Sequence, residues 1–360
     1  MTELGSDAVV ERVPLILDVD TGIDDSLALL YACASPEVDL LAVTCVGGNT
    51  HARQAARNTL AVLELAGRTD VPVLLGREEP LVKPLETSAE THGPEGLGYA
   101  TLPEATRPLE PGHASERIVE LARARPGEVL LVTLGPLTNL AVALEREPNL
   151  PQLLGAYALM GGAYRGSGNT TPAAEWNVYV DPDAARAVFA AWAALDTSDA
   201  PRPLAMGLEV TERARLLPGH VAALARLAGA PPEDAAALAR DGLQAVGSVA
   251  ADPVLRFLAD ALRFYFEFHA RYDGFYGAFV HDPFVVAAAL DASLVRSNPV
   301  FVDVETGSGP AHAMTVADWR GLTRRPPNLD VVVEANADRF LEELVERLGG
   351  LAALCAGVAL

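Results

Sequence analysis

The sequence predicts an α/β protein with a mostly parallel sheet and helices on both faces of that sheet. The first observation is that short Leu-, Ile- and Val-rich runs alternate with longer helical stretches through the first 160 residues. The second is that half of the 360 residues are hydrophobic, which is enough to bury a large core. In a fold of this class, ligands bind where the carboxyl ends of the strands meet.

The elements of the first half alternate between strand and helix. The sequence predicts strands at 15–19, 38–46, 71–75 and 129–134 and one that ends at Met160, with helices at 24–34, 52–66, 114–125 and 137–146. A stretch rich in Pro, Gly and Glu at 77–111 interrupts the alternation. The order of these elements is that of a parallel sheet connected by helices.

The second half is more helical. Helices are predicted at 184–194, 221–227, 235–246, 254–272, 284–290 and 337–347, strands at 300–304 and 329–333, and loops at 194–203 and 229–232. The sequence contains no internal repeat and no low-complexity linker long enough to separate two domains. We therefore expect a single domain, residues 1–360, in which a helical addition accompanies the α/β core.

Composition excludes several classes of partner. The 48 acidic and 27 basic residues give a formal net charge of −21, which argues against a nucleic-acid polymer or an anionic membrane surface. The three cysteines are too few and too scattered for a disulfide framework. The first residues lack the features of a signal peptide, and no run reaches the roughly 18 apolar residues of a membrane span. We expect a soluble, cytoplasmic protein.

Four aspartates surround the end of the first predicted strand. Asp18 and Asp20 share one face of the strand because side chains alternate with a period of two, and Asp24 and Asp25 open the next helix. Helix capping alone would explain the second pair. Capping does not explain two aspartates on a strand end, where four carboxylates repel one another unless a cation compensates. Hard oxygen ligands of this kind suit Ca²⁺ or Mg²⁺.

Polar segments follow three later strands. The segments 46–50 (VGGNT) and 134–139 (LGPLTN) have compositions that are also ordinary for turns. The segment 160–177 contains Asn169, Glu175 and Asn177, which suit hydrogen bonds to a polyhydroxylated ligand. Further along, Asp282 precedes a proline and an apolar helix, a pattern that fits a helix cap, as at 181–182. His281 beside it favours a functional role, since a histidine near a metal-bound carboxylate can act as an acid.

Together these segments resemble the inosine–uridine-preferring nucleoside hydrolase family. The motifs are DVDTGIDD at 18–25, GGN at 47–49, LGPLTN at 134–139, MGGA, GN and PAAEWN within 160–177, and HDP at 281–283. The resemblance implies a nucleoside hydrolase-like fold with a Rossmann-like core. It also implies an enzyme of nucleoside catabolism or salvage that hydrolyses the N-glycosidic bond of ribonucleosides, and assembly as a homodimer or homotetramer.

The resemblance also assigns roles to positions of this sequence. Ca²⁺ would be held by Asp20, Asp25, Asp282 and the backbone carbonyl of Leu134, and Asp20 would activate the Ca-bound water. Asp18 matches a supporting position. The substrate would be bound by Asp24, Asn49, His92, Met160, Asn169, Glu175 and Asn177. His281 or His92 would supply a proton to the departing base, although a histidine in a Gly/Pro-rich segment such as 91–98 is also typical of an exposed loop.

Two other functions remain open at this stage. A phosphatase of the haloacid dehalogenase class also carries two aspartates at the end of its first strand, as Asp18 and Asp20 are arranged here. It needs a basic residue as well, and the single lysine, Lys83, lies in a proline-containing loop. The other function is a catalytically inactive nucleoside-binding protein. The helix 254–272 carries an aromatic stripe, Phe264, Tyr265, Phe268, His269 and Tyr272, that fits either a core face or a stacking platform.

Overall fold

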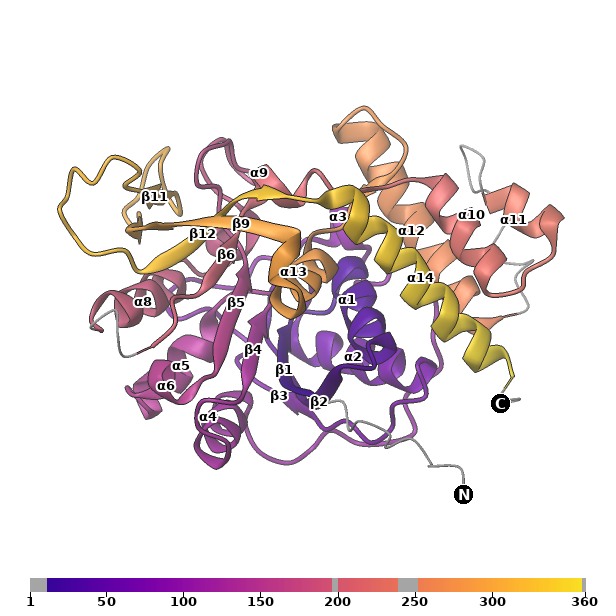
Figure 1. The fold of residues 1–360 in the computed structure, drawn as a ribbon, viewed down its shortest axis with the longest axis horizontal. Helices are drawn as coiled ribbons and strands as arrows, with labels where there is room; N and C mark the ends of the chain where they lie inside the picture. The colour runs from indigo at the N-terminus through magenta and orange to yellow at the C-terminus, as the bar shows by residue number, and fades with distance from the viewer. Residues whose placement is uncertain (1–11, 196–199, 239–251, 358–360) are drawn as a thin grey trace, which may run out of the picture.

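The computed structural model describes residues 12–195, 200–238 and 252–357. An eight-stranded sheet with the order β3-β2-β1-β4-β5-β6-β12-β9 runs through its centre (Figure 1). The strands are β1 (Val13–Val19), β2 (Val38–Cys45), β3 (Val73–Leu75), β4 (Leu130–Thr133), β5 (Ala156–Met160), β6 (Leu204–Met206), β9 (Val295–Val300) and β12 (Leu329–Ala335). Neighbouring strands pair in parallel except β12 and β9, which are antiparallel. The predicted fold class is confirmed.

Helices cover both faces of the sheet (Figure 1). Alternate side chains of β1 enter different hydrophobic clusters, with Leu15, Leu17 and Val19 in one and Ile16 in the other. The first cluster includes side chains of α1 (Ile23–Ala34), α2 (Ala52–Leu65), α12 (Pro253–Tyr272), α13 (His281–Leu290) and α14 (Ala337–Ala356). The second includes α4 (Ala114–Ala124), α5 (Thr138–Arg146) and α8 (Pro182–Ala193). The apolar strand runs of the sequence therefore form a sheet that is buried on both sides.

The helical addition consists of α10 (Pro218–Leu227), α11 (Pro232–Leu238) and α12, packed with α14 at one end of the molecule (Figure 1). The helix predicted at 337–347 continues to Ala356 because Leu348, Leu351 and Ala352 also enter the core. The helix predicted at 235–246 begins at Pro232, and its second half lies outside the described residues.

Several strands of the second half differ from the sequence prediction. It placed one strand at 300–304, whereas the structure has β9, which ends at Val300, and β10 (Val302–Val304), which turns away to pair with β11 (Thr315–Ala317). β9 is a partly exposed edge strand that contains Arg296 and Pro299, so it has no apolar run to reveal it. β6, β11 and the paired strands β7 (Arg215–Leu216) and β8 (Ala278–Phe279) were missed because each has only two or three residues.

The carboxyl ends of β1, β2, β4 and β5 lie together at one edge of the sheet. Beyond the strands, Val46 N–H donates to Val19 O (2.9 Å) and Leu134 N–H donates to Asp18 O (2.8 Å). These hydrogen bonds keep the turns after β2 and β4 beside the end of β1. The aspartate, GGN and LGPLTN motifs therefore meet in space, as expected for parallel strands.

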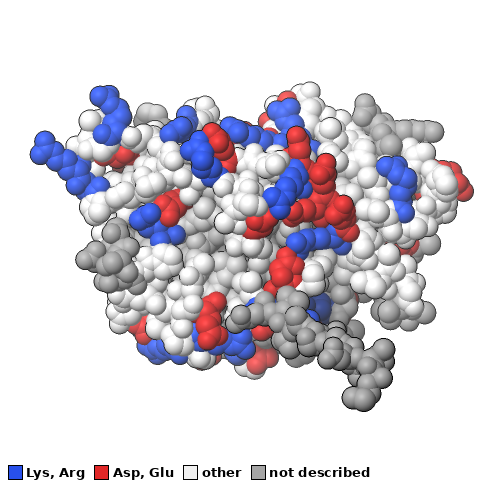
Figure 2. Space-filling view, in the orientation of Figure 1, with Lys and Arg blue, Asp and Glu red and all other residues white. Residues whose placement is uncertain are grey.

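Charged side chains on the outside are mixed in sign. On the face shown in Figure 2, acidic and basic side chains are interspersed. Along α14, Arg339 pairs with Asp291 and Glu343, and Arg347 pairs with Glu37. The acidic excess is thus locally compensated in this region. None of the helices among the described residues combines the length and the apolar character needed to cross a membrane.

Candidate active site

A cavity of about 620 Å³ opens at the carboxyl edge of the sheet. It is lined by ten of the residues singled out in the sequence: Asp24, Asn49, His92, Leu134, Met160, Asn169, Glu175, Asn177, His281 and Asp282. Asp20 and Asp25 do not line it, but both bond to Asn49. The backbone N–H of Asn49 donates to Asp20 Oδ2 (2.6 Å), and its side-chain Nδ2 donates to Asp25 Oδ2 (3.2 Å). The structure therefore gathers the predicted residues around one site.

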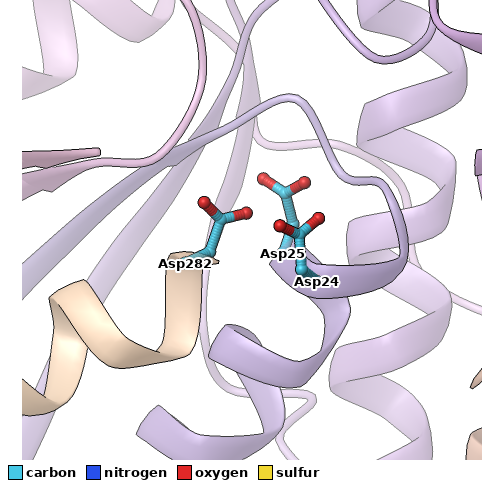
Figure 3. A group of neighbouring side chains, drawn as sticks. All are labelled: Asp24, Asp25 and Asp282. Atoms are coloured by element: carbon cyan, nitrogen blue, oxygen red, sulfur yellow. The ribbon is translucent and has the colours of Figure 1, made fainter. Parts of the chain in front are cut away.

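Three carboxylates form a compact group at this site (Figure 3). Oxygen atoms of Asp24, Asp25 and Asp282 all lie within 4.8 Å of one another. Asp24 and Asp25 come from the first turn of α1, and Asp282 comes from the first turn of α13. The capping interpretation of Asp282 is wrong, because the N-cap of α13 is Val280. The same interpretation holds for Asp181, which accepts a hydrogen bond from Ala184 N–H (3.0 Å).

Burial and mutual repulsion disfavour the charged forms of these carboxyl groups. Burial raises the pKa of Asp20 and Asp24 well above the usual value, and the charge of Asp25 raises both further. Burial and then the charge of Asp24 do the same for Asp282. Asp20 Oδ1 and Asp24 Oδ1 are buried and have no hydrogen-bond partner. Clustered buried carboxylates with orphaned oxygens fit a divalent cation with oxygen ligands, which would offset their charge.

The group of three differs in one member from the ligand set that the resemblance implies, because it contains Asp24 and not Asp20. Asp25 and Asp282 belong to both sets. Asp25 already accepts hydrogen bonds from the N–H groups of Asp20 (3.2 Å) and Gly22 (2.8 Å). The carbonyl of Leu134 lies at the cavity and accepts a hydrogen bond from Asn177 Nδ2 at 2.6 Å.

Two glycines allow the backbone to close around Asp20. A Cβ atom on Gly48 would lie 2.1 Å from Asp20 Oδ2, and one on Gly135 would lie 2.8 Å from Asp20 Oδ1. Neither distance leaves room for a side chain without moving Asp20 or the backbone. Gly48 of the GGN motif and Gly135 of the LGPLTN motif are therefore required because two turns approach the same carboxylate closely. This requirement is separate from the general preference for glycine in turns.

Glu175 and Asn177 form the polar wall of the cavity. Glu175 is the N-cap of α7 (Trp176–Val180), and its carboxylate accepts hydrogen bonds from the N–H groups of Asn177 (2.8 Å), Gly162 (2.9 Å) and Val178 (3.1 Å). Burial raises the pKa of this carboxyl group, and these donors lower it. Asn177 also donates from Nδ2 to Met160 O (3.2 Å). Hydrogen bonds thus hold both side chains against the ends of the strands.

Two histidines at the cavity are buried and neutral. His92, at the end of α3 (Ala89–His92), is only 5% exposed, so the exposed-loop interpretation is wrong. The N–H of Ile23 donates to His92 Nδ1 (3.1 Å), so the proton of the neutral ring is on Nε2. His281 Nδ1 lies 2.8 Å from the hydroxyl of Thr211. Burial lowers the pKa of each ring to about 3, and both are therefore uncharged at pH 7.

The aromatic stripe of α12 divides between core and cavity. Tyr265, Phe268, His269 and Tyr272 line the cavity, whereas Phe264 contacts the edge of Tyr99 with ring centroids 5.0 Å apart. Trp176 of the PAAEWN motif also lines the cavity, as do Glu212, Asp273 and Phe279, which sequence reasoning missed. Asp273 follows His269 by one helical turn and bonds to its Nδ1 at 2.7 Å, so the i, i+4 spacing was an available signal.

Asp18 and Lys83 lie outside the cavity. Asp18 Oδ1 accepts hydrogen bonds from Thr44 Oγ1 (2.6 Å) and Asn139 Nδ2 (2.8 Å), which ties β1 to β2 and α5. Lys83 stands over the ring of Tyr179, 3.8 Å from its centroid. In a phosphatase these two residues would have to meet at the reacting phosphate, and neither lines the cavity.

Comparisons with known proteins identify the family of the chain. The family model described as inosine-uridine preferring nucleoside hydrolase matches residues 15–342. The pyrimidine-specific ribonucleoside hydrolase RihA of Enterobacter sp. (strain 638) is 37% identical over 337 residues, which cover 93% of this chain and 97% of that one. RihA of Escherichia coli (strain K12) is also 37% identical over 337 residues, with shares of 93% and 98%.

A solved structure of a ribonucleoside hydrolase is also similar to this chain. The purine-preferring ribonucleoside hydrolase from Gardnerella vaginalis superposes with a TM-score of 0.82 and 32% identity, covering 95% of this chain and 99% of that one. The family model spans most of the chain, and the relatives are similar over nearly their whole lengths. The protein is therefore a nucleoside hydrolase and belongs to the inosine-uridine preferring nucleoside hydrolase family.

Proposed function

We propose that the protein hydrolyses the N-glycosidic bond of ribonucleosides to a free nucleobase and ribose with the help of a divalent cation, Ca²⁺. The observation that carries this proposal is the composition of the 620 Å³ cavity. Carboxylates, hydrogen-bonding side chains and the aromatic side chains of α12 line it together. A ribose with its hydroxyl groups matches the polar side chains, and a planar base matches the aromatic ones.

The cation would be held by Asp25 and Asp282, with Asp20 and the Leu134 carbonyl as further donors. When bound, Ca²⁺ lowers the pKa of a water molecule and fixes its place. Asp20 accepts the proton of the attacking water, since its Oδ1 has no other partner. Asp24 is a member of the group of three carboxylates and lines the cavity. Its Oδ1 has no hydrogen-bond partner and can accept a hydrogen bond from a ribose hydroxyl.

The remaining polar groups bind and stabilise the sugar. Asn49, Asn169, Glu175 and Asn177 hold the ribose hydroxyls, and Met160 contacts the sugar ring. Cleavage of the glycosidic bond passes through an oxocarbenium-like state, in which positive charge develops on the sugar. The buried carboxylates of the site favour that charge because they are fixed before the reaction. His281 donates a hydrogen bond from its neutral ring to the departing base, and His92, which also lines the cavity, contacts the base.

A substrate panel tests the proposed function. The purified protein is incubated with purine and pyrimidine ribonucleosides in phosphate-free buffer, because the relatives' names include both a pyrimidine-specific and a purine-preferring enzyme. We expect free base and ribose in equal amounts from at least one member of the panel. A requirement for phosphate, or binding without turnover for every member, would contradict the proposal. A nitrophenyl phosphate included in the panel is expected to remain intact.

His281→Phe is expected to lower kcat by about 10²-fold on natural nucleosides, because it removes a hydrogen-bond donor from the negative charge that develops on the departing base. The same variant should retain near-parental activity on a riboside whose leaving group is nitrophenolate, because that group departs without such help. His51→Phe, at an exposed position before α2, serves as the control and should leave both rates unchanged. Equal losses on the two kinds of substrate would show that His281 does not act on the leaving group.

A further inference from the structure

The loop that follows β5 is held in place by hydrogen bonds from Thr315 and Trp319, which lie much later in the sequence. The hydroxyl of Thr315, a buried residue at the start of β11, accepts a hydrogen bond from Ala163 N–H (3.1 Å) and donates one to Ala163 O (2.8 Å). The indole Nε1 of Trp319 donates to Tyr164 O at 2.9 Å. Two consecutive loop residues are therefore fixed by side chains that lie 152 and 155 positions later in the sequence.

The residue before this attachment has a special backbone conformation. Gly162 has a φ of +86°, which side chains rarely allow, and a Cβ atom there would lie 3.0 Å from Thr315 Cγ2. In this conformation its N–H points to Glu175 Oε2 (2.9 Å), and its carbonyl accepts a hydrogen bond from Leu208 N–H (3.1 Å). The orientation of the N–H group that donates to Glu175 thus depends on the hydrogen bonds made by the Gly162 carbonyl and by the next residue, Ala163.

Packing holds the side chains of the two loop residues, and hydrogen bonds hold their backbone. Ala163 and Tyr164 are each 5% exposed and belong to the two hydrophobic clusters. A second cavity of about 260 Å³ follows them, lined by Arg165, Glu209, Arg213 and Trp319 among others. Arg165 lies over the Trp319 indole, with its guanidinium carbon 3.8 Å from the ring centroid. Packing alone does not fix the direction of a peptide group, so the hydrogen bonds of Thr315 and Trp319 set the orientation of this backbone.

We propose that Thr315 is a positioning residue for substrate binding and that Trp319 assists it. The hydroxyl of Thr315 fixes the peptide of Ala163, which aims the N–H of Gly162 at Glu175 and so fixes the Glu175 carboxylate against the ribose. Displacing a substrate-positioning group by about 1 Å can cost 10²-fold in rate, so a remote contact of this kind affects catalysis. This inference rests on the proposed function, because it assigns Glu175 to a ribose hydroxyl.

The test compares Thr315→Val with Thr315→Ser. Valine keeps the shape but leaves the N–H and C=O of Ala163 without partners, whereas serine keeps the hydroxyl. Each variant is assayed on the best ribonucleoside and on its 2′-, 3′- and 5′-deoxy analogues, and Glu175→Gln shows which hydroxyl Glu175 holds. We expect Thr315→Val to raise KM about tenfold for the parent nucleoside and to reduce discrimination at that same hydroxyl. Thr315→Ser should keep both values.

Two further variants test the second hydrogen bond to the loop and a hydroxyl elsewhere. Trp319→Phe retains an aromatic ring under Arg165 but removes the donor to Tyr164, so it should reproduce the loss of discrimination in milder form even if Thr315→Val does not fold. Thr306→Val, which removes a hydroxyl bonded to Arg186 after β10, is the control. A parental enzyme that cleaves no ribonucleoside overturns the proposed function and this inference together. The parental enzyme can instead be active while Thr315→Val and Trp319→Phe both discriminate against the deoxy analogues as the parent does. That result overturns this inference alone, and so does an equal loss of discrimination at all three hydroxyl positions.

Discussion

Asp20→Asn is expected to reduce kcat for ribonucleoside hydrolysis by about 10²–10⁴-fold, the range observed when a general base is removed. An amide keeps an oxygen that can accept the hydrogen bond from Asn49 N–H, but it cannot take a proton from water. The loss should therefore appear in kcat with little change in the thermal midpoint of unfolding. Steady-state kinetics and a thermal melt of the same preparation measure the two quantities.

Asp18→Asn provides the matched control for Asp20→Asn. Asp18 is two residues away, is equally buried and lies in β1, which ends one residue before Asp20. Both of its hydrogen-bond donors reach Oδ1, and Oδ2 has no partner, so an amide can keep the two contacts. Burial raises the pKa of this carboxyl to about 7, which brings its neutral form within reach at physiological pH. We expect less than a tenfold loss of kcat, and equal losses at positions 18 and 20 would refute a base role for Asp20.

Removal of divalent cations is expected to lower activity by about 10²–10³-fold, since charge stabilisation by a metal ion is worth several kcal/mol. Added Ca²⁺ should restore the activity and raise the thermal midpoint of unfolding in a concentration-dependent way. The gain in stability follows from the buried carboxylates, which repel one another when no cation offsets their charge. Activity assays and thermal melts over a Ca²⁺ titration of chelator-treated protein measure both effects.

Asp282→Asn should abolish the Ca²⁺-dependent rise in the thermal midpoint. Asp183→Asn is the comparison, because Asp183 also lies in the first turn of a helix but belongs to no carboxylate group at the cavity. It should keep the full response to Ca²⁺. Activity that is indifferent to a strong chelator would exclude a role for the cation in the reaction.

The sequence predicted the sheet well where strands are buried on both faces. β1, β2 and β4 are apolar along most of their lengths, and helices separate them, so the alternation is visible in the residues alone. It failed for the polar edge strand β9, which pairs with the later strand β12, and for the three-residue strands β6 and β11, which are too short to show an apolar run.

The site was predictable for the same reason that the sheet was. Parallel strands bring their carboxyl ends together, so motifs that follow β1, β2, β4 and β5 had to be neighbours. The sequence could not show which of four aspartates approach Asp282, because that depends on the direction in which α1 leaves the strand. Glu212 and Phe279 reach the cavity from segments that carry no motif. His92 looked exposed from its Gly- and Pro-rich neighbours, and the backbone of Ile23 instead binds its ring within the protein.

The position of β12 bears on how the protein folds during its synthesis. β12 pairs with β6 on one side and β9 on the other, and both of those strands precede it in the chain. A nascent chain that ends before Thr315 already contains every aspartate of the site, yet its cavity wall has no attachment at Ala163. Contacts between residues so far apart form late and slowly in folding. The segment through β12 must therefore leave the ribosome before the sheet can be completed, and a chain truncated ahead of β12 would leave β6 and β9 with unpaired edges.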